Sequence, residues 1–397
     1  MGQLALEVGA SMDLGSTCGG DMRKKLAQFM ICGAVASLTA CVPSANNLAN
    51  NLANVPLNDI GHQSAIQGDG TRDAWRWPFS ADSIWNRPLG SNAQLVPAGL
   101  AGPKAVIVDV NYIFRVPAGA PERPVYLNPS WEVRCSGVKA QFNPKARKTV
   151  PIPDDWVIPN AGSNNASAFL LPDGRTLVQI NPLARCARGG PVYGGVTQDV
   201  DLYGPGVEGG HGGSGMSSIG GTIRLGELTS PNPIQHALKV TLWSRKYMAI
   251  NNDGTPGFRW PALNADGYFR DPNIGYAGRV PALEMGALLA IGPNETPEKL
   301  GIKTEVGRKL FAALKDYGAY VVDDSACDCF NLTAEQGVNE ESKRVFGYGL
   351  QTVGGPLFDD LNKMINYLFV VNNNAPNAVG GGGTPRRPLA LPFAAGR

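Results

Sequence analysis

The chain carries little charge and few histidines, and it lacks the motifs of several common enzyme classes. Charged residues make up 17% of the 397 residues, the formal net charge is +2, and three residues are histidine. No long run of Lys or Arg supplies a basic surface for nucleic acid. No Gly-Lys-Ser or Gly-Lys-Thr follows a glycine loop, and no nucleophile elbow lies in a strand-to-helix setting. We therefore expect no nucleic-acid partner, no nucleotide chemistry and no serine nucleophile.

Glycine and proline are abundant instead. The 50 glycines and 31 prolines favour many turns and short strands over long helices. Short apolar runs, such as 105–110 and 176–180, alternate with these residues at the spacing of an all-β sandwich or barrel. The sequence therefore predicts a mainly β fold, a jelly-roll-like β-sandwich with a few peripheral helices. Helices are expected at 304–317 and 357–368.

The start of the chain has the pattern of an export signal. Residues 22–25 are Met-Arg-Lys-Lys, and the apolar run at 26–36 is too short to span a bilayer. The following Leu-Thr-Ala-Cys ends at Cys41 and resembles the lipobox of bacterial lipoproteins, in which the cysteine is acylated. The resemblance implies lipidation of Cys41 and anchoring to a membrane through lipid. Val42, in place of an aspartate, favours the outer membrane or cell surface of a Gram-negative host.

Composition divides the chain into five parts. Residues 1–21 precede a better start methionine, and 22–40 are the expected signal peptide. Residues 41–71, with the repeat Asn-Asn-Leu-Ala, are too poor in apolar side chains to fold alone and are expected to be a flexible tether. We expect a single β-rich domain at 72–371 and a disordered tail at 372–397, which contains four consecutive glycines.

Four cysteines follow Cys41, an even number in a protein expected to be exported, so disulfides are predicted. They are Cys135, Cys186, Cys327 and Cys329. Three pairings are possible, and the spacing does not choose among them. Metal binding by Cys327 and Cys329 is the weaker alternative because no histidine lies near them. The sequence predicts no metal site and identifies no cofactor.

Two of the three histidines lie in one segment, 204–242. His211 is surrounded by glycines, which favour tight turns or a close approach of the backbone to another group. Alternation at 222–228 and 236–242 predicts a hairpin that presents His236. Imidazole titrates near neutral pH, so both are candidate general bases. The alternatives are a solvated loop residue for His211 and a backbone-bonded histidine for His236.

Carboxylates cluster around that segment in the sequence. A glycosidase needs two carboxyl groups flanking the scissile bond, one protonated and one ionised. Two candidates, Asp199 and Asp201, would share a face of a strand, an arrangement that also suits simple solvation. For a hydrolase, two of five residues would share the acid and base work: Asp199, Asp201, Glu208, Glu227 and Asp266.

A second candidate site is the loop at 259–268, which combines Arg259, Trp260 and Asp266. Sugar rings stack on aromatic side chains such as tryptophan through their apolar faces. In a lyase, one of the histidines would remove the proton beside a uronate carboxylate, while Arg224 or Arg259 neutralises that carboxylate. Tyr203 would then protonate the leaving oxygen.

Three segments together resemble a broad group of exported bacterial proteins of uncharacterised function. They are 79–89, which contains Trp85-Asn86, then 220–228 with the nearby His236, and the Arg-Trp-Pro-Ala loop at 259–262. The resemblance implies no particular reaction. Members of that group carry a Trp-Gly-Ala type loop where this chain has His211, whereas they share His236. The resemblance therefore implies that His236 belongs to a shared framework and that His211 is peculiar to this chain.

These features together predict a surface-anchored carbohydrate-active enzyme, a polysaccharide lyase or a glycoside hydrolase, acting on an extracellular polysaccharide. The alternative is a non-catalytic glycan-binding or surface-assembly lipoprotein. The expected partners are a polysaccharide and, through the lipid on Cys41, a membrane.

Overall fold

The computed structural model describes residues 65–131, 133–135, 138–139, 147–158, 164–250 and 257–394. Cys41, the predicted signal peptide and most of the predicted tether lie outside these residues. The described residues all belong to one unit of the chain. Within it, no helix is long and apolar enough to cross a membrane.

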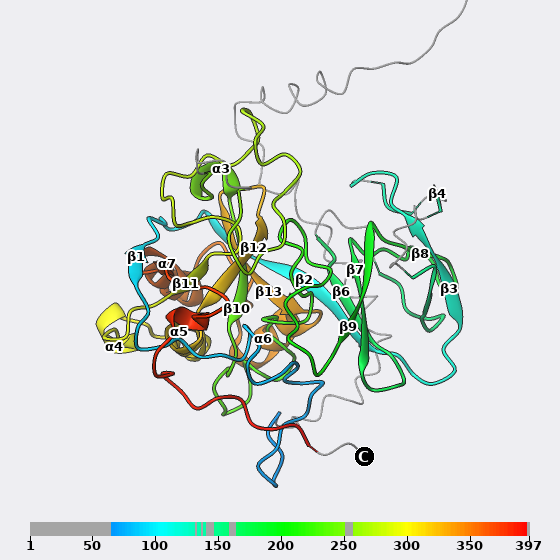
Figure 1. Ribbon diagram of the computed structural model, residues 1–397, viewed down its shortest axis with the longest axis horizontal. Coiled ribbons are helices and arrows are strands. Elements are labelled where there is room, and N and C mark those ends of the chain that lie inside the picture. Colours follow the sequence, from blue (N-terminus) through cyan, green and yellow to red (C-terminus); the bar gives the residue numbers. More distant parts are fainter. Residues whose placement is uncertain are drawn as a thin grey trace, which may run out of the picture. The chain divides into compact units, whose positions relative to one another are not determined.

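Ten strands form one large mixed sheet (Figure 1). Their order is β1 (Leu95–Pro97), β14 (Phe369–Val371), β11 (Leu288–Ala290), β12 (Ala319–Asp324), β10 (Leu238–Leu242), β13 (Cys329–Glu335), β2 (Ala105–Arg115), β6 (Ser167–Leu170), β7 (Thr176–Asn181) and β9 (Val196–Asp201). The pairs β10–β12, β13–β2 and β2–β6 are parallel. The long β2 joins the two halves of the sheet, because its first part pairs with β13 and its last part with β6.

A small sheet packs beside one end of the large sheet. It contains β3 (Glu122–Leu127), β4 (Val138–Lys139), β5 (Thr149–Pro151) and β8 (Val192–Tyr193). Apolar side chains from both sheets, among them Val125 and Val150 from the small sheet and Phe169 and Val178 from the large one, form a separate core between them. The mainly β class is therefore confirmed, and the packed sheets are consistent with a β-sandwich. The parallel pairs were not part of the prediction.

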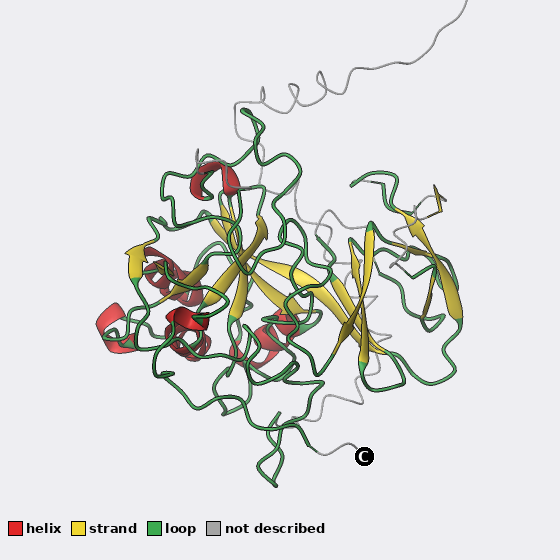
Figure 2. Ribbon diagram, viewed as in Figure 1, coloured by secondary structure: helices red, strands yellow, loops and turns green. Residues whose placement is uncertain are grey.

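All described helices lie beside the large sheet (Figure 2). They are α3 (Ser244–Tyr247), α4 (Pro297–Leu300), α5 (Glu305–Asp316), α6 (Val338–Phe346), α7 (Pro356–Asn366) and the 3-10 turn η2 (Val379–Gly381). The two predicted helices are confirmed as α5 and α7. The Thr304 hydroxyl accepts the backbone N–H of Gly307 at 3.0 Å, which caps α5, and Val306, Leu310 and Leu314 face the core.

The centre of the large sheet is buried on both faces. Every residue of β10 and β13 is buried, so other parts of the chain cover both faces of these strands. Polar side chains on these strands are therefore buried too, and Lys239 on β10 is 0% exposed. Buried charged groups are rare unless they are paired, so these positions are candidates for a special role.

The predicted hairpin is wrong in its first half. β10 is the expected second strand, but residues 224–230 form successive turns. The Arg224 N–H donates to the Glu227 carboxylate at 2.7 Å, and Gly226 has a φ of 85°. The chain therefore reverses where the alternation of polar and apolar residues had predicted a strand.

The predicted disordered tail, 372–397, is folded up to residue 394. The glycines at 380–383 all have positive φ values and form a specific turn. Gly90 donates its N–H to the Gly380 carbonyl at 2.9 Å, and Arg387 pairs with Asp316 at 2.6 Å. The glycine run is therefore a tightly packed turn, which composition does not distinguish from a mobile segment.

Candidate functional site

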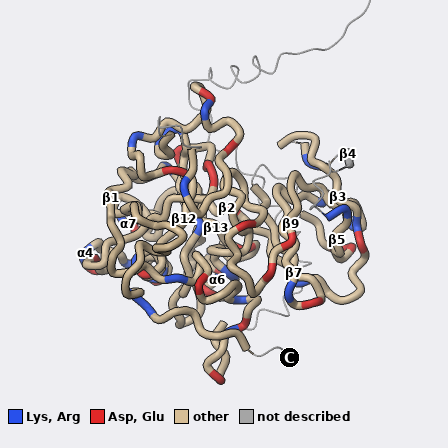
Figure 3. The backbone as a smooth tube through the Cα atoms, viewed as in Figure 1, with Lys and Arg blue, Asp and Glu red and all other residues tan. Residues whose placement is uncertain are grey.

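The two histidines of segment 204–242 occupy different buried clusters. The His211 cluster contains Asp109 on β2, Lys239 on β10, Asp323 and Asp324 on β12, and Asp266 in the loop after Trp260. The His236 cluster contains Arg224, Glu227, Glu335 and Glu341. Elsewhere along the described backbone, positions of Lys and Arg alternate with positions of Asp and Glu (Figure 3).

His211 is 1% exposed and lies between two carboxyl groups. Its Nε2 is 3.1 Å from Asp109 Oδ2, so this nitrogen carries the proton that Asp109 accepts. Its Nδ1 has no hydrogen-bond partner and lies 3.8 Å from Asp323 Oδ2. Burial, and then the charge of Lys239, lower the pKa of His211. The imidazole is therefore uncharged at neutral pH, with a free acceptor directed at Asp323.

The glycines after His211 allow the backbone to close over two carboxyl groups. A Cβ atom at Gly212 would lie 1.5 Å from Asp323 Oδ2, and one at Gly213 would lie 2.5 Å from Asp266 Oδ1. The Gly213 N–H donates to Asp323 Oδ1 at 3.0 Å. A side chain at either glycine would displace a carboxyl group, so the glycine-rich loop is needed for this close approach.

Asp266 and Asp323 form a coupled pair of carboxyl groups. Burial raises the pKa of Asp266 to about 6, and the Asp324 carboxylate adds to this rise. Burial, and then the charge of Asp266, raise the pKa of Asp323 well above its ordinary value. Two such groups titrate as a pair. The charged form is disfavoured at both groups, and more strongly at the more deeply buried Asp323.

Two tyrosine hydroxyls orient Asp266 and the neighbouring Asp324. Tyr276 donates to Asp266 Oδ2 at 2.6 Å, and Tyr268 donates to Asp324 Oδ2 at 2.8 Å. Asp266, Tyr268 and Asp324 are only partly buried, unlike His211. A bound molecule can therefore contact Asp266 directly, whereas His211 acts on it only through Asp323.

Lys239 binds the backbone of the glycine-rich segment through its ammonium group. Its Nζ donates to the carbonyl oxygens of Ser217 and Ser218, both at 2.8 Å. Burial lowers the pKa of Lys239 well below its ordinary value, although Asp109 opposes this effect. Lys239 therefore fixes the backbone after His211.

The His236 cluster has a different character, because its charges are paired. His236 Nδ1 donates to the Ala237 carbonyl at 2.8 Å, and Nε2 lies 3.0 Å from Glu227 Oε1. Burial alone would lower the pKa of His236, but Glu227 outweighs it and the pKa is raised. Burial likewise opposes the charge of Glu227, yet His236 lowers the pKa of this carboxyl. The two side chains therefore form a partly buried ion pair, with His236 buried and Glu227 22% exposed.

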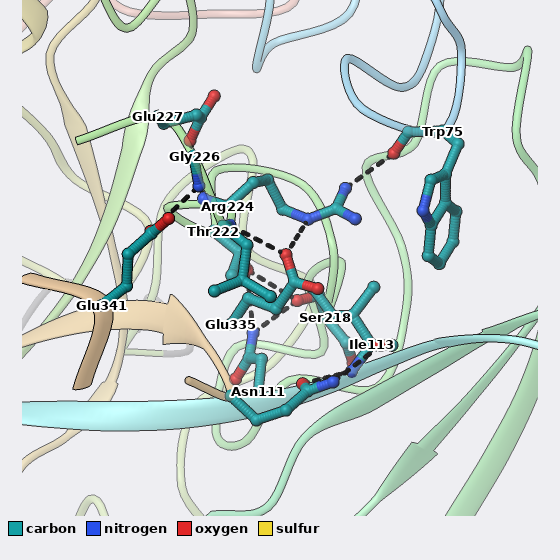
Figure 4. A network of polar contacts seen from close by, with 12 residues as sticks. Trp75, Asn111, Ile113, Ser218, Thr222, Arg224, Gly226, Glu227, Glu335 and Glu341 are labelled. Carbon is teal, nitrogen blue, oxygen red and sulfur yellow. Dashed lines mark hydrogen bonds and ion pairs between the residues drawn. The ribbon is translucent and has the colours of Figure 1, made fainter. Parts of the chain in front are cut away.

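Arg224 extends this cluster toward β13 (Figure 4). Its Nε donates to Glu335 Oε2 at 2.7 Å, and a terminal nitrogen donates to the Trp75 carbonyl at 2.7 Å. Glu335 also accepts the backbone N–H of Leu225, and Glu341 accepts that of Gly226. With these partners, the His236 cluster fixes the turns at 224–230 in place.

Several residues predicted to form a site lie apart from both clusters. Asp199 and Asp201 on β9 pair with Arg147 at 2.8 Å and Arg175 at 2.5 Å. Tyr203 packs edge-on against the ring of Phe393. No contact among the described residues joins these three to His211 or His236.

The predicted loop at 259–268 contributes Asp266 to the His211 cluster. The other two predicted residues of this loop, Arg259 and Trp260, contact the backbone and the core of the protein instead. Arg259 donates to the carbonyls of Ala282 at 2.9 Å and Asn372 at 2.5 Å. Trp260 precedes a cis proline and packs against the main core. Glu208 is exposed and forms an isolated bridge in the glycine-rich loop.

The sequence interpretation did not assign Asp109, Lys239 or Asp323 to the site. Each is a charged residue at a buried position in a largely apolar strand. Such an interruption is a usable signal, because an ionised side chain is seldom placed in a strand buried on both faces without a function or a partner.

The cysteine pairing is Cys135 with Cys186 and Cys327 with Cys329. Within the described ranges, no group of three or more His, Cys, Asp or Glu side chains is arranged to hold a metal ion.

Comparisons of the chain with family models, with curated proteins and with solved structures gave no match. Function is therefore argued from the site itself.

Proposed function

We propose that the protein is an exported, lipid-anchored carbohydrate-active enzyme that hydrolyses glycosidic bonds in an extracellular polysaccharide. The observation that carries this proposal is the pair Asp266 and Asp323, two carboxyl groups that lie against the backbone of neighbouring glycines and whose pKa values are both raised by burial. Glycoside hydrolysis needs one carboxylic acid and one carboxylate on either side of the scissile bond. Asp323 is the proton donor in this proposal, and Asp266 is the partly exposed carboxylate.

The same geometry favours hydrolysis over the lyase mechanism. Arg224 and Arg259, the cations expected to neutralise a uronate, are held by Glu335 and by backbone carbonyls. His211 is buried and has a lowered pKa, and His236 is paired with Glu227. No histidine in the described part of the chain is both exposed and placed beside a free arginine.

The buried histidine has a positioning role in this mechanism. Asp109 orients the imidazole of His211, and the unpaired Nδ1 faces the carboxyl group of Asp323. A neutral imidazole at this place favours the protonated form of Asp323 over the charged form. His211→Ala should therefore shift the pH profile of the reaction, which a residue with a purely structural role would not do.

A panel of polysaccharides tests the proposal, with new reducing ends reporting hydrolysis and ultraviolet absorbance reporting unsaturated lyase products. Asp266→Asn should lower turnover roughly 100- to 10,000-fold, because one acid–base group contributes that much. Asp82→Asn, which removes a surface carboxylate that is 80% exposed, is the matched control and should keep full activity. Full activity of Asp266→Asn, or unsaturated products from the wild type, would overturn the hydrolase assignment.

One observation favours the second candidate, a glycan-binding lipoprotein. A groove of about 970 Å³ runs between the first described residues and the ends of β2 and β6, and Trp75, Tyr203 and Arg115 are among its lining residues. The groove contains neither carboxyl group of the pair. Polysaccharide binding that survives Asp266→Asn, disappears in Trp75→Ala and gives no product in the wild type would support this candidate.

A further inference from the structure

The groove at the end of β2 lies apart from the His211 cluster. It has a volume of about 970 Å³, and its walls come in part from segment 66–75, from the ends of β2 and β6, and from Tyr203 and Phe393. Arg115, the last residue of β2, follows Asp109 by six positions, which is about 20 Å along an extended strand. Asp109 belongs to the His211 cluster. The groove is therefore a second site, separate from the carboxyl pair.

Arg115 presents its guanidinium group to this groove. The side chain is 55% exposed, and its nearest carboxyl oxygen, Asp73 Oδ1, lies 3.7 Å away, which is too far for a hydrogen bond. The guanidinium carbon lies 5.3 Å from the centre of the Trp75 ring, and this cation–π contact holds the group in place. Arg115 therefore offers a positioned fork of N–H donors to a ligand.

A second cation of the groove, Arg72, forms no ion pair with a carboxyl group of the described residues. Its side chain is 1% exposed, and the guanidinium group lies 3.8 Å from the centre of the Phe393 ring. It donates to the carbonyl oxygens of Leu391, Trp77 and Phe79. Burial lowers the pKa of Arg72 to about 10, so it remains charged at neutral pH. Buried charges are usually paired, so an anion in the groove would offset this one.

The hydrogen bonds of the groove also favour an anion. Asp69 and Asp73 line it too, so the formal charges of the arginines and aspartates balance. Asp69 accepts the backbone N–H and the hydroxyl of Thr71, and Asp73 accepts the backbone N–H of Trp75. The donors of Arg115, by contrast, have no acceptor within hydrogen-bond distance among the described residues. A carboxylate supplies two acceptors in the geometry of the guanidinium fork.

Aromatic side chains in the groove indicate what carries the carboxylate. Trp75 and Tyr203 line it, and Arg224 holds Trp75 through the carbonyl oxygen at 2.7 Å. Sugar rings stack on such side chains through their apolar faces. We infer that the groove binds an acidic polysaccharide and that Arg115 recognises the carboxylate of a uronic acid unit. This inference rests on the proposed function for the polysaccharide, and it names the chemical class. The groove holds one part of the polymer while the distant carboxyl pair acts on another.

The test is a calorimetric titration of the full chain with a tetramer of galacturonic acid and with its fully methyl-esterified form, which lacks the charge. Asp266→Asn is present throughout, so that the proposed hydrolysis does not consume the ligand. The acid should bind at least about tenfold more tightly than the ester, as expected for one charge-assisted contact. Added salt should reduce this preference.

Variants of Arg115 identify the residue that reads the charge. Arg115→Gln should remove the preference for the acid and leave binding of the ester unchanged. Arg115→Lys keeps the charge without the planar fork, so it should retain part of the preference. Arg308→Gln, which removes an exposed arginine of α5 paired with Glu298, is the matched control and should keep all of it.

The outcomes separate this inference from the proposed function. Equal binding of acid and ester overturns the inference, as does a preference that survives Arg115→Gln or a failure of the acid tetramer to bind. Binding of the acid that depends on Arg115, in a protein whose wild type cleaves no polysaccharide, supports the inference and contradicts the enzyme. Cleavage that depends on Asp266, in a protein that binds acid and ester equally, supports the enzyme and overturns the inference.

Discussion

The two buried histidines lie 25 positions apart and experience opposite electrostatic environments. His236 has a carboxylate at 3.0 Å and a raised pKa, whereas His211 has an unpartnered nitrogen and a lowered pKa. Burial opposes charge at both places, and each ring has a carboxylate about 3 Å away. Glu227 outweighs burial at His236, whereas Asp109 does not at His211, where the charge of Lys239 adds to the effect of burial. We call the His236 cluster compensated and the His211 cluster uncompensated. The first holds the turns at 224–230 in place, and the second has the shifted pKa values that are typical of a functional site.

The largest expected effect on stability is in the compensated cluster. Arg224→Ala leaves Glu335 buried without its cation and should lower the free energy of unfolding by about 3 to 5 kcal/mol. Arg175→Ala breaks the exposed pair with Asp201 and should cost less than about 1 kcal/mol. Denaturant titration of both variants measures the difference. Equal losses would show that the His236 cluster is no more structural than a surface ion pair.

In the uncompensated cluster, removing a charge should stabilise the protein. The folded state raises the pKa of Asp323, so the stability linked to this group is complete below the ordinary pKa of aspartate and falls as pH rises. Asp323→Asn keeps the acceptor for the Gly213 N–H but cannot ionise. It should raise the free energy of unfolding at pH 7 by about 1 to 2 kcal/mol, and the gain should vanish near pH 4.

Asp201→Asn is the control for this variant, since Asp201 is an exposed carboxylate in a surface ion pair. Its effect should stay within about 0.5 kcal/mol at every pH. Thermal unfolding at a series of pH values follows both variants. A loss of stability in Asp323→Asn at pH 7 would mean that the carboxylate serves the fold.

The smallest expected effect is the pH dependence of the His236–Glu227 pair. The raised pKa of His236 gives stability that is complete below about pH 6.5 and is lost as pH rises through the folded value. The lowered pKa of Glu227 gives stability that is present above about pH 4.3 and is lost as pH falls. The pair should therefore contribute most between these values.

A comparison of the wild type with Glu227→Gln isolates the contribution of the His236–Glu227 pair to the free energy of unfolding. The difference in free energy of unfolding should change by about 1 kcal/mol between pH 6 and pH 8. Other groups titrate in the same range, but they cancel in the difference. An unchanged difference across that range would show that His236 is not charged in the folded protein.

The sequence predicted local features well. Alternation and turn residues identified the mainly β class, and the stripe of Val306, Leu310 and Leu314 identified α5, because these patterns depend on near neighbours. The same reasoning was wrong at 222–228 and at the C-terminal tail. In the first, contacts with Glu335 and Glu341 hold turns where the pattern suggested a strand. In the second, packing orders a glycine run that composition predicts to be mobile.

The candidate site was predicted only in part. The glycine-rich loop with His211 and the loop with Asp266 stood out because both combine chemically active side chains with turn residues. Asp109 and Asp323 did not, since each lies in a strand whose apolar neighbours suggested only a core. His211 and Asp109 are 102 positions apart, and no local pattern reports a contact of that range.

The sequence by itself determined that this chain forms short strands broken by glycine and proline, with helices predicted at 304–317 and 357–368 that the structure has at 305–316 and 356–366. It also determined that a glycine-flanked histidine, His211, a second histidine, His236, and several carboxyl groups are available for chemistry. Only the tertiary structure decided which of them meet. The mixed order of the sheet brings β2, β10 and β12 together beneath one loop, and burial there raises or lowers each pKa according to the partners that long-range packing supplies.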